Sequence, residues 1–189
     1  KMPGDDWQRF ANLRLLYTYL YTYPGAKLLF MGCELAEPGE WRHQGQLSWE
    51  LLEQAPHRGV QQLVGDLNRL YRSEPSLYRH PFEPGGFEWI DCHDSTQSVL
   101  SFLRRDGEDF HVVVLNFTPV VRNFYRIGVP RAGSYREVLN SDSRFYGGSD
   151  TGNSLLIDSE PTPWMGYKHS ISLTLPPLGA LVLKPCGGE

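Results

Sequence analysis

The sequence predicts two kinds of structure in succession: a helix–strand–helix segment of the α/β type, then an all-β antiparallel sandwich. Residues 6–23 and 57–73 repeat apolar side chains at spacings of three and four, on either side of a short apolar run at 27–32. From about His80, seven short stretches rich in β-branched and aromatic residues alternate with turn signals. The shift in pattern over 78–84 predicts a boundary, with residues 1–79 and 80–189 as the two domains.

The first helix is predicted from a cap, an apolar face and a stop signal. Asp5 or Asp6 can accept hydrogen bonds from the free N–H groups of the first turn, and Pro24-Gly25 ends the pattern. The predicted apolar face consists of Phe10, Leu13, Leu16, Tyr17 and Leu20.

The apolar run at 27–32 predicts a buried strand, because it is apolar on both faces, as a central parallel strand is. A loop rich in Trp, Glu and Gly follows, and then a second amphipathic helix that ends before Pro75. Its predicted face consists of Val60, Leu63, Val64, Leu67 and Tyr71. About 80 residues cannot close a β/α barrel, which takes about 250. This part of the chain therefore reads as the end of one.

The second part predicts an antiparallel sandwich. Its candidate strands are FEWID, SVLSFLRR, FHVVVLNF, NFYRIGV, SYREVLN, SISLTL and ALVLK. Asp106-Gly107, Gly147-Gly148 and Pro176-Pro177 mark turns between them. Seven short strands separated by such turns are typical of a sandwich, and we expect residues 80–189 to fold alone.

Composition narrows the function classes. A net charge of −4 offers no electrostatic attraction for nucleic acid or an anionic membrane. Three cysteines, far apart and odd in number, favour a reducing cytoplasm over a disulfide framework. No apolar run is long enough to span a membrane. Lys1 directly before Met2 predicts that the sequence is a piece of a longer protein.

The loop after the predicted strand holds the candidate binding residues. Glu34 comes just past the carboxyl end of the strand, where barrel active sites assemble, and it could position a substrate hydroxyl or a catalytic neighbour. It could equally be a structural carboxylate that bonds loop N–H groups. Trp41, with Glu40 beside it, suits the apolar face and hydroxyls of a sugar. The alternative is that such tryptophans pin the loop to the barrel, which we favour for Trp49.

Other motifs are predicted to be structural. His93-Asp94 lies in a polar cluster between two strands and reads as a turn. The six histidines show no metal spacing, and residues 140–153 lack the residue order of a calcium loop. A glycosidase or glycosyl transferase of the retaining type needs two carboxylates across the bond, and no such pair can be built here. We predict no catalytic residue, no metal and no cofactor on this chain.

Several motifs taken together carry a resemblance. KMPGDDWQRFANLRLL, KLLFMGCELAEPGEW, QLSW, HRGVQQLVGDLNRLYR, GFEWID, LNSDSRFYGGS and SLTLPPLGALVL follow one another in order. As a set they closely resemble the C-terminal part of bacterial 1,4-α-glucan (glycogen) branching enzymes, members of the α-amylase superfamily, from Lys1 to about Lys184.

The resemblance implies an enzyme that cleaves an α-1,4-glucan, holds it on an Asp and transfers it to a 6-hydroxyl as an α-1,6 branch. The family's catalytic residues would lie on earlier barrel strands, so this chain alone would be inactive. Residues 27–32 would be the eighth strand, and the missing N-terminal part of the barrel would be a partner.

The resemblance also implies that α-glucan, as glycogen or amylose, is the ligand. Glucan would bind outside the active site too, with Trp7 and Trp89 as stacking platforms and Asp5 taking hydroxyls. Each tryptophan could instead pack inward. Two alternatives remain for the chain itself: a non-catalytic glucan-binding module and a purely structural β domain.

Overall fold

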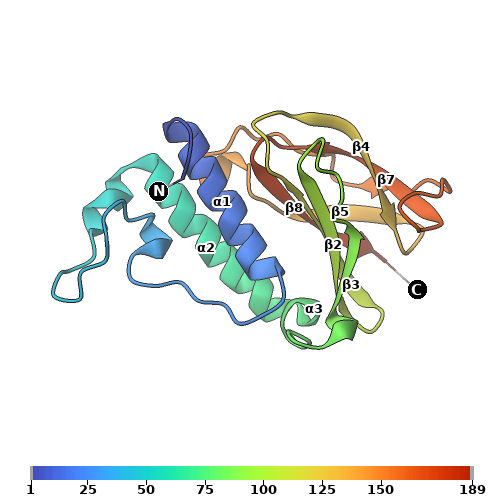
Figure 1. The fold of residues 1–189 in the computed structure, drawn as a ribbon, viewed down its shortest axis with the longest axis horizontal. Coiled ribbons are helices and arrows are strands. Elements are labelled where there is room, and N and C mark those ends of the chain that lie inside the picture. Colours follow the sequence, from blue (N-terminus) through green and yellow to red (C-terminus); the bar gives the residue numbers. More distant parts are fainter. Residues whose placement is uncertain (1, 188–189) are drawn as a thin grey trace.

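The computed structural model describes residues 2–187, so Lys1 and residues 188–189 lie outside the described part. Helices α1 (Asp6–Thr22) and α2 (Ala55–Ser73) lie side by side against the β-sheet, and the short α3 (Pro75–Tyr78) leads into it (Figure 1). The strands are β1 (Phe87–Asp91), β2 (Val99–Asp106), β3 (Asp109–Asn116), β4 (Arg122–Val129), β5 (Ser134–Asn140), β6 (Ile157–Asp158), β7 (His169–Leu175) and β8 (Gly179–Cys186). No helix within residues 2–187 is long and apolar enough to cross a bilayer.

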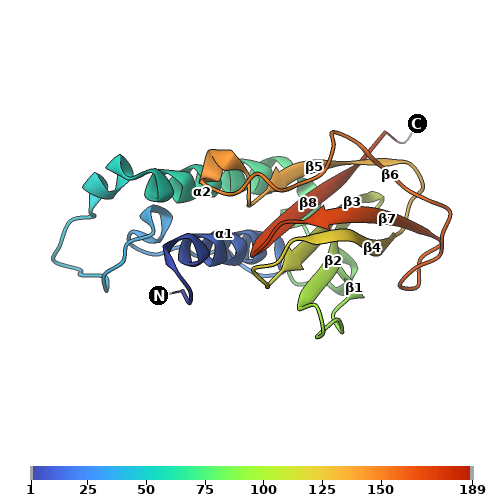
Figure 2. The same cartoon turned by 90° about the horizontal axis from the view of Figure 1, so that it is seen from above.

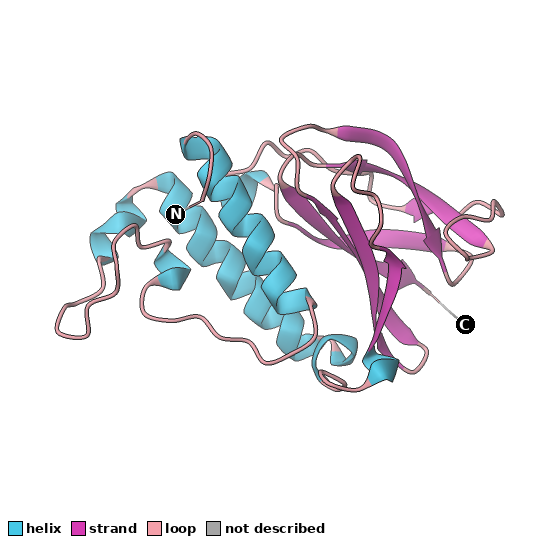
Figure 3. Cartoon of the chain, viewed as in Figure 1, coloured by secondary structure: helices cyan, strands magenta, loops and turns pink. Residues whose placement is uncertain are grey.

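The all-β part is confirmed as two antiparallel sheets. One has the strand order β1-β2-β3-β8-β5-β6 and the other pairs β4 with β7. All seven predicted strands form, and the sequence missed only the two-residue β6. The views from the side and from above show three layers: the helices, the larger sheet and the β4-β7 ribbon (Figures 2 and 3).

The larger sheet is buried on both faces. On one face Val112, Val114 and Leu183 pack against Ile127 and Ile171 of the ribbon. On the other face Phe102, Val113, Leu115, Ala180 and Val182 share a core with Leu15, Val60, Leu63 and Leu67 of the helices. This second core crosses the boundary predicted near residue 80, so the packing argues against independent folding of the β part.

Helix α1 begins as predicted and buries part of the predicted face: Tyr17 is buried, and Phe10 and Leu13 are half-buried against the core. Asp5 is its N-cap, and Gln8 completes a capping box. The backbone N–H of Gln8 donates to Asp5 Oδ1 at 2.8 Å, and the backbone N–H of Asp5 donates to Gln8 Oε1 at 3.1 Å. Leu16, predicted to be buried, is 44% exposed. The buried positions instead include polar ones, because Thr18 and Thr22 donate hydroxyl protons to carbonyls one turn back.

The predicted strand at 27–32 is corrected by the structure. The segment has no regular secondary structure, and its apolar side chains Leu28 and Phe30 are 77% and 54% exposed. Lys27, Leu29 and Met31 are half-buried, and Leu29 packs on the helical core. A parallel strand requires a neighbour on its ladder, and the described residues place none beside this segment.

The second helix agrees with its prediction. Val60, Leu63, Val64 and Leu67 are all buried, and the helix ends at Ser73, before Pro75. Tyr71 is half-buried and stacks edge-on with Tyr21 of α1 at 6.3 Å.

Two buried arginines fasten the helical layer to the sheet. Arg14 of α1 donates to the carbonyl of Ser141 at 2.9 Å, and its guanidinium lies 3.7 Å from Asp142. Arg104 of β2 donates to the carbonyls of Thr22, Gly86 and Leu77 at 2.7, 3.0 and 3.1 Å. Burial lowers the pKa of both guanidinium groups. Arg14 meets oxygens of the loop after β5, and Arg104 meets carbonyls from three separate segments.

Candidate functional site

A cavity of about 460 Å³ lies between the start of α1, the loop after residue 30 and the start of α2. Its apolar wall comes from Phe10, Leu13, Tyr17, Phe30, Met31 and Trp41. Its polar groups come from Asp6, Arg9, Glu37, Glu40 and His57. The cavity therefore combines an aromatic, apolar wall with several carboxylates.

Trp41 is the most accessible aromatic side chain of this cavity. Its ring is 57% exposed and meets Phe30 edge-on, with centroids 5.5 Å apart and planes at 85°. Asp6 and Arg9, which also line the cavity, form an ion pair at 3.4 Å. An indole face beside carboxylates matches the two surfaces of a pyranose, one apolar and one rich in hydroxyls.

Glu34 is held away from this cavity. It lies in the 3-10 helix η1 (Cys33–Leu35), is half-buried and is absent from the cavity lining. Burial is the main cause of the raised pKa of the Tyr17 and Tyr21 phenols, and the nearby Glu34 carboxylate raises both further. Its carboxylate therefore lies close enough to these two tyrosines of α1 to act on their pKa values, and its role in binding stays a prediction.

Asp5 and Trp7 lie at the first turn of α1. The Asp5 carboxylate is engaged in the capping box, and the Trp7 ring is 37% exposed. Neither residue lines the cavity, although Asp6 between them does.

Trp89 lies at the other end of α1. Its ring contacts Tyr23, Phe87 and Phe102, with centroids 6.1, 4.9 and 5.8 Å away, and it remains 37% exposed. Sixteen residues of helix separate Trp7 from Tyr23, which is about 24 Å at 1.5 Å per residue. Trp7 and Trp89 therefore do not form one site.

Motifs predicted to be structural lie in turns and loops. His93-Asp94 follows β1, with His93 exposed and Asp94 accepting the hydroxyl proton of Tyr125 at 2.7 Å. In the loop after β5, Asp142 accepts the backbone N–H of Ser149 at 2.9 Å and that of Thr151 at 3.3 Å. These carboxylates hold turns, as expected.

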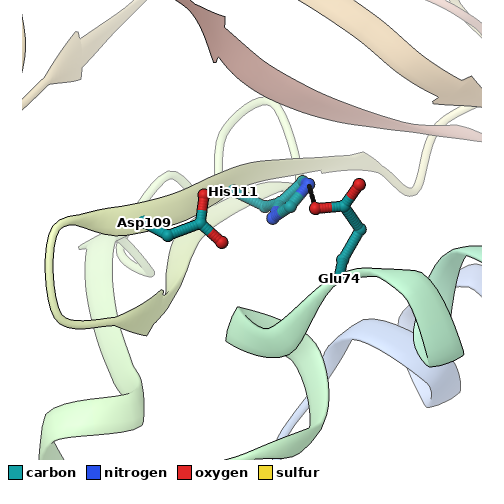
Figure 4. Close-up of side chains that lie close together, drawn as sticks. All are labelled: Glu74, Asp109 and His111. Carbon is teal, nitrogen blue, oxygen red and sulfur yellow. Dashed lines mark ion pairs between the residues drawn. The ribbon is translucent and has the colours of Figure 1, made fainter. Parts of the chain in front are cut away.

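One side-chain cluster has the donor types of a metal site. Glu74, Asp109 and His111 each offer a ligand atom, and these atoms lie within 4.8 Å of one another (Figure 4). However, the Lys184 ammonium contacts the Glu74 carboxylate and lies 3.6 Å from that of Asp109. The two carboxylates are thus already paired with a cation, and the cluster joins α2 to β3 and β8.

Sequence reasoning missed the cavity residues that come from helices. Tyr17 was assigned to an apolar face and His57 was given no role, yet both line the cavity and bond the loop beside it. Gly32, with a φ of +88° just before η1, is the one sequence signal that marked this turn.

The fold and the cavity together define a fragment of the α-amylase class. The chain belongs to the family described as "Alpha amylase, C-terminal all-beta domain", whose model matches residues 89–186.

Named relatives make the assignment narrower. The chain is 63% identical over 184 residues to the 1,4-alpha-glucan branching enzyme GlgB of Cellvibrio japonicus, covering 97% of this chain and 25% of that protein. It is 57% identical over 188 residues to that of Marinobacter nauticus, covering 98% of this chain and 30% of the relative. The predicted resemblance to branching enzymes is confirmed, and the chain spans about a quarter of the length of these relatives.

Solved structures share the fold. An α-amylase of Geobacillus thermoleovorans, complexed with acarbose, matches 95% of this chain with a TM-score of 0.61 at 18% identity, over 34% of its own length. A debranching enzyme of Nostoc punctiforme matches 92% of this chain with a TM-score of 0.65 at 17% identity, over 31% of its own length. Both matches extend beyond the β strands into the helical part, since each covers more than nine-tenths of the chain.

Proposed function

We propose that this chain is the C-terminal portion of a 1,4-α-glucan branching enzyme, and that its cavity forms part of the wall along which α-glucan binds. One observation carries this proposal. The cavity lies where the segment at 26–31 ends and where α1 and α2 begin. In β/α barrels that end of the strands and helices is the face on which active sites assemble.

Residues 1–79 would form the end of the catalytic barrel and residues 80–189 the β domain. The exposed side chains of Leu28 and Phe30 support this arrangement, because a barrel strand buries its inner face only when the other strands surround it. The segment would then become the eighth strand by pairing with strands of the longer protein. That missing barrel portion is the macromolecular partner that we propose.

The chemistry requires a nucleophile and an acid on opposite sides of the glycosidic bond, about 5–5.5 Å apart in a retaining enzyme. We propose that these carboxylates come from the longer protein, so the isolated chain transfers no glucan. Three free cysteines, Cys33, Cys92 and Cys186, support a cytoplasmic location, where glycogen or amylose would be the substrate.

The test of the cavity is Trp41→Ala in the intact protein, with Trp164→Ala as control, since Trp164 is comparably exposed at 46% on the β part. Loss of one stacking face is expected to raise KM for amylose about three- to tenfold. An unchanged KM in Trp41→Ala would show that the cavity does not contact glucan.

The second candidate function is a non-catalytic glucan-binding module, favoured by the exposure of Trp7 and Trp89 at two separate places. Affinity electrophoresis in glycogen gels compares Trp7→Ala, Trp89→Ala and the parent. Equal retardation of all three would make these tryptophans packing residues. Transfer of glucan by the purified 189-residue chain would instead contradict the assignment of the catalytic carboxylates to the longer protein.

A further inference from the structure

The loop that forms one wall of the cavity has a base under backbone strain. Met31 and Ala36 are non-glycine residues with φ of +35° and +56°, on either side of η1, and Gly32 lies at +88°. Left-handed backbone at non-glycine residues is costly and persists only where surrounding contacts impose it.

Two side chains from two different helices supply these contacts. The Tyr17 hydroxyl of α1 donates to the Cys33 carbonyl at 2.7 Å. The His57 ring of α2 approaches the Leu35 carbonyl with Nδ1 at 2.7 Å, so Nδ1 carries the proton and donates. Tyr17 and His57 are both at least nine-tenths buried, and Leu35 itself is fully buried.

The two bonds hold η1 at both of its ends. The Cys33 carbonyl also accepts the N–H of Ala36 at 3.1 Å, and the Gly32 carbonyl accepts the N–H groups of Leu35 and Glu37 at 2.9 and 3.1 Å. The turn is thus closed by its own backbone and fixed to α1 and α2 by side chains. Glu37, Glu40 and Trp41 of the cavity wall follow directly along the chain.

We propose that Tyr17 and His57 are positioning residues: they fix the base of the 33–41 loop so that its Trp41 and acidic side chains meet α-glucan in one geometry. This inference rests on the proposed function. The two residues act through the loop, since the Tyr17 hydroxyl and the His57 Nδ1 are engaged by its carbonyls. A ligand whose site is correctly formed for only part of the time binds more weakly by that fraction.

The variants separate positioning from packing. Tyr17→Phe removes one hydroxyl and keeps the ring. Tyr135→Phe is its matched control, because Tyr135 is also buried and donates its hydroxyl to a backbone carbonyl, that of Arg131, at 2.7 Å. His57→Leu removes the second donor, whereas His57→Asn keeps an N–H donor near the position of Nδ1.

Two measurements are made on the intact protein. Amide hydrogen exchange, read by mass spectrometry, follows peptides that cover 32–41, and steady-state kinetics with amylose give KM and kcat separately. In Tyr17→Phe and His57→Leu we expect faster exchange in the loop and a three- to tenfold higher KM, with kcat changed less than twofold. Tyr135→Phe is expected to lower Tm without either effect, and His57→Asn to restore most of the parent KM.

Each alternative outcome is distinguishable. Unchanged loop exchange in both variants would overturn the role of these two hydrogen bonds. Faster exchange with an unchanged KM would overturn their role in glucan binding. Failure of the proposed function itself is read from Trp41→Ala, whose KM would then equal that of the parent while the exchange result stands.

Discussion

Replacing Arg104 by methionine tests whether a buried guanidinium joins the helical layer to the sheet. The side chain is fully buried and donates to three carbonyls, which belong to the end of α1, to α3 and to the turn before β1. Methionine fills a similar space without donors. The substitution therefore removes all three hydrogen bonds and leaves the three carbonyls inside the protein.

The expected loss of stability follows from the three carbonyls that remain buried without a donor. An unsatisfied buried polar group costs about 1–3 kcal/mol, so three of them would cost several kcal/mol. Burial opposes the charged guanidinium, as its lowered pKa indicates, and methionine relieves that opposing cost. We expect the free energy of unfolding to fall by about 3–5 kcal/mol, a large part of the total for a domain of this size.

Urea unfolding followed by circular dichroism measures this difference. Arg105→Met is the matched control, because Arg105 is partly exposed and pairs with Glu88 at 2.9 Å. Loss of this pair should lower the free energy of unfolding by only about 0–1 kcal/mol. The reasoning is refuted if the Arg104 and Arg105 variants unfold within 1 kcal/mol of each other at equal m-values.

Three further outcomes are expected. A fragment of residues 80–189 would expose the sheet face that contains Phe102, Val113 and Val182, so it should bind a hydrophobic dye and aggregate. A single cooperative unfolding transition of a monomeric fragment would contradict the shared core. Asp5→Ala should lower the free energy of unfolding by about 1 kcal/mol through loss of the cap, and Asp5→Ser should recover most of this loss. If the affinity for glycogen falls in both variants, the Asp5 carboxylate also contacts glucan. Burial lowers the pKa of His111 to about 4, below its ordinary value of 6.5, so the folded state disfavours the protonated ring. Stability is therefore complete above about pH 6.5 and falls by up to about 3 kcal/mol as the pH drops toward 4, and His111→Gln should flatten this slope in urea titrations at several pH values.

The elements that the sequence predicted correctly are those whose signals are local. The cap at Asp5, the face of α2 and seven of the strands depend on spacing and turn residues within a few positions. The run at 27–32 looked like a strand for the same reason. A strand, however, exists only with a partner on its ladder, and pairing across a barrel is not a local property.

The buried face of α1 could be predicted only in part, since several of its residues are polar. Arg14 and Thr18 are both almost fully buried: Arg14 Nε donates to the Ser141 carbonyl, which is distant in the chain, and the Thr18 hydroxyl donates to a carbonyl one turn back. Of the binding residues that the sequence suggested, Trp41 lines the cavity, and its contact with glucan stays a prediction. Tyr17 and His57, which are 40 positions apart in the chain, join it only through the packing of α1 against α2.

The geometry of the cavity depends on the β part through a chain of contacts. The loop at 33–41 has little regular structure of its own and is held by Tyr17 and His57. The helices that carry these residues are held in turn by the core shared with β2, β3 and β8, and by Arg14 and Arg104. A small displacement of α1 against the sheet would move the Tyr17 hydroxyl and, with it, one end of η1. In the proposed enzyme, the β domain would therefore influence glucan handling without contacting the reacting sugar, by fixing the helices on which the cavity wall is built.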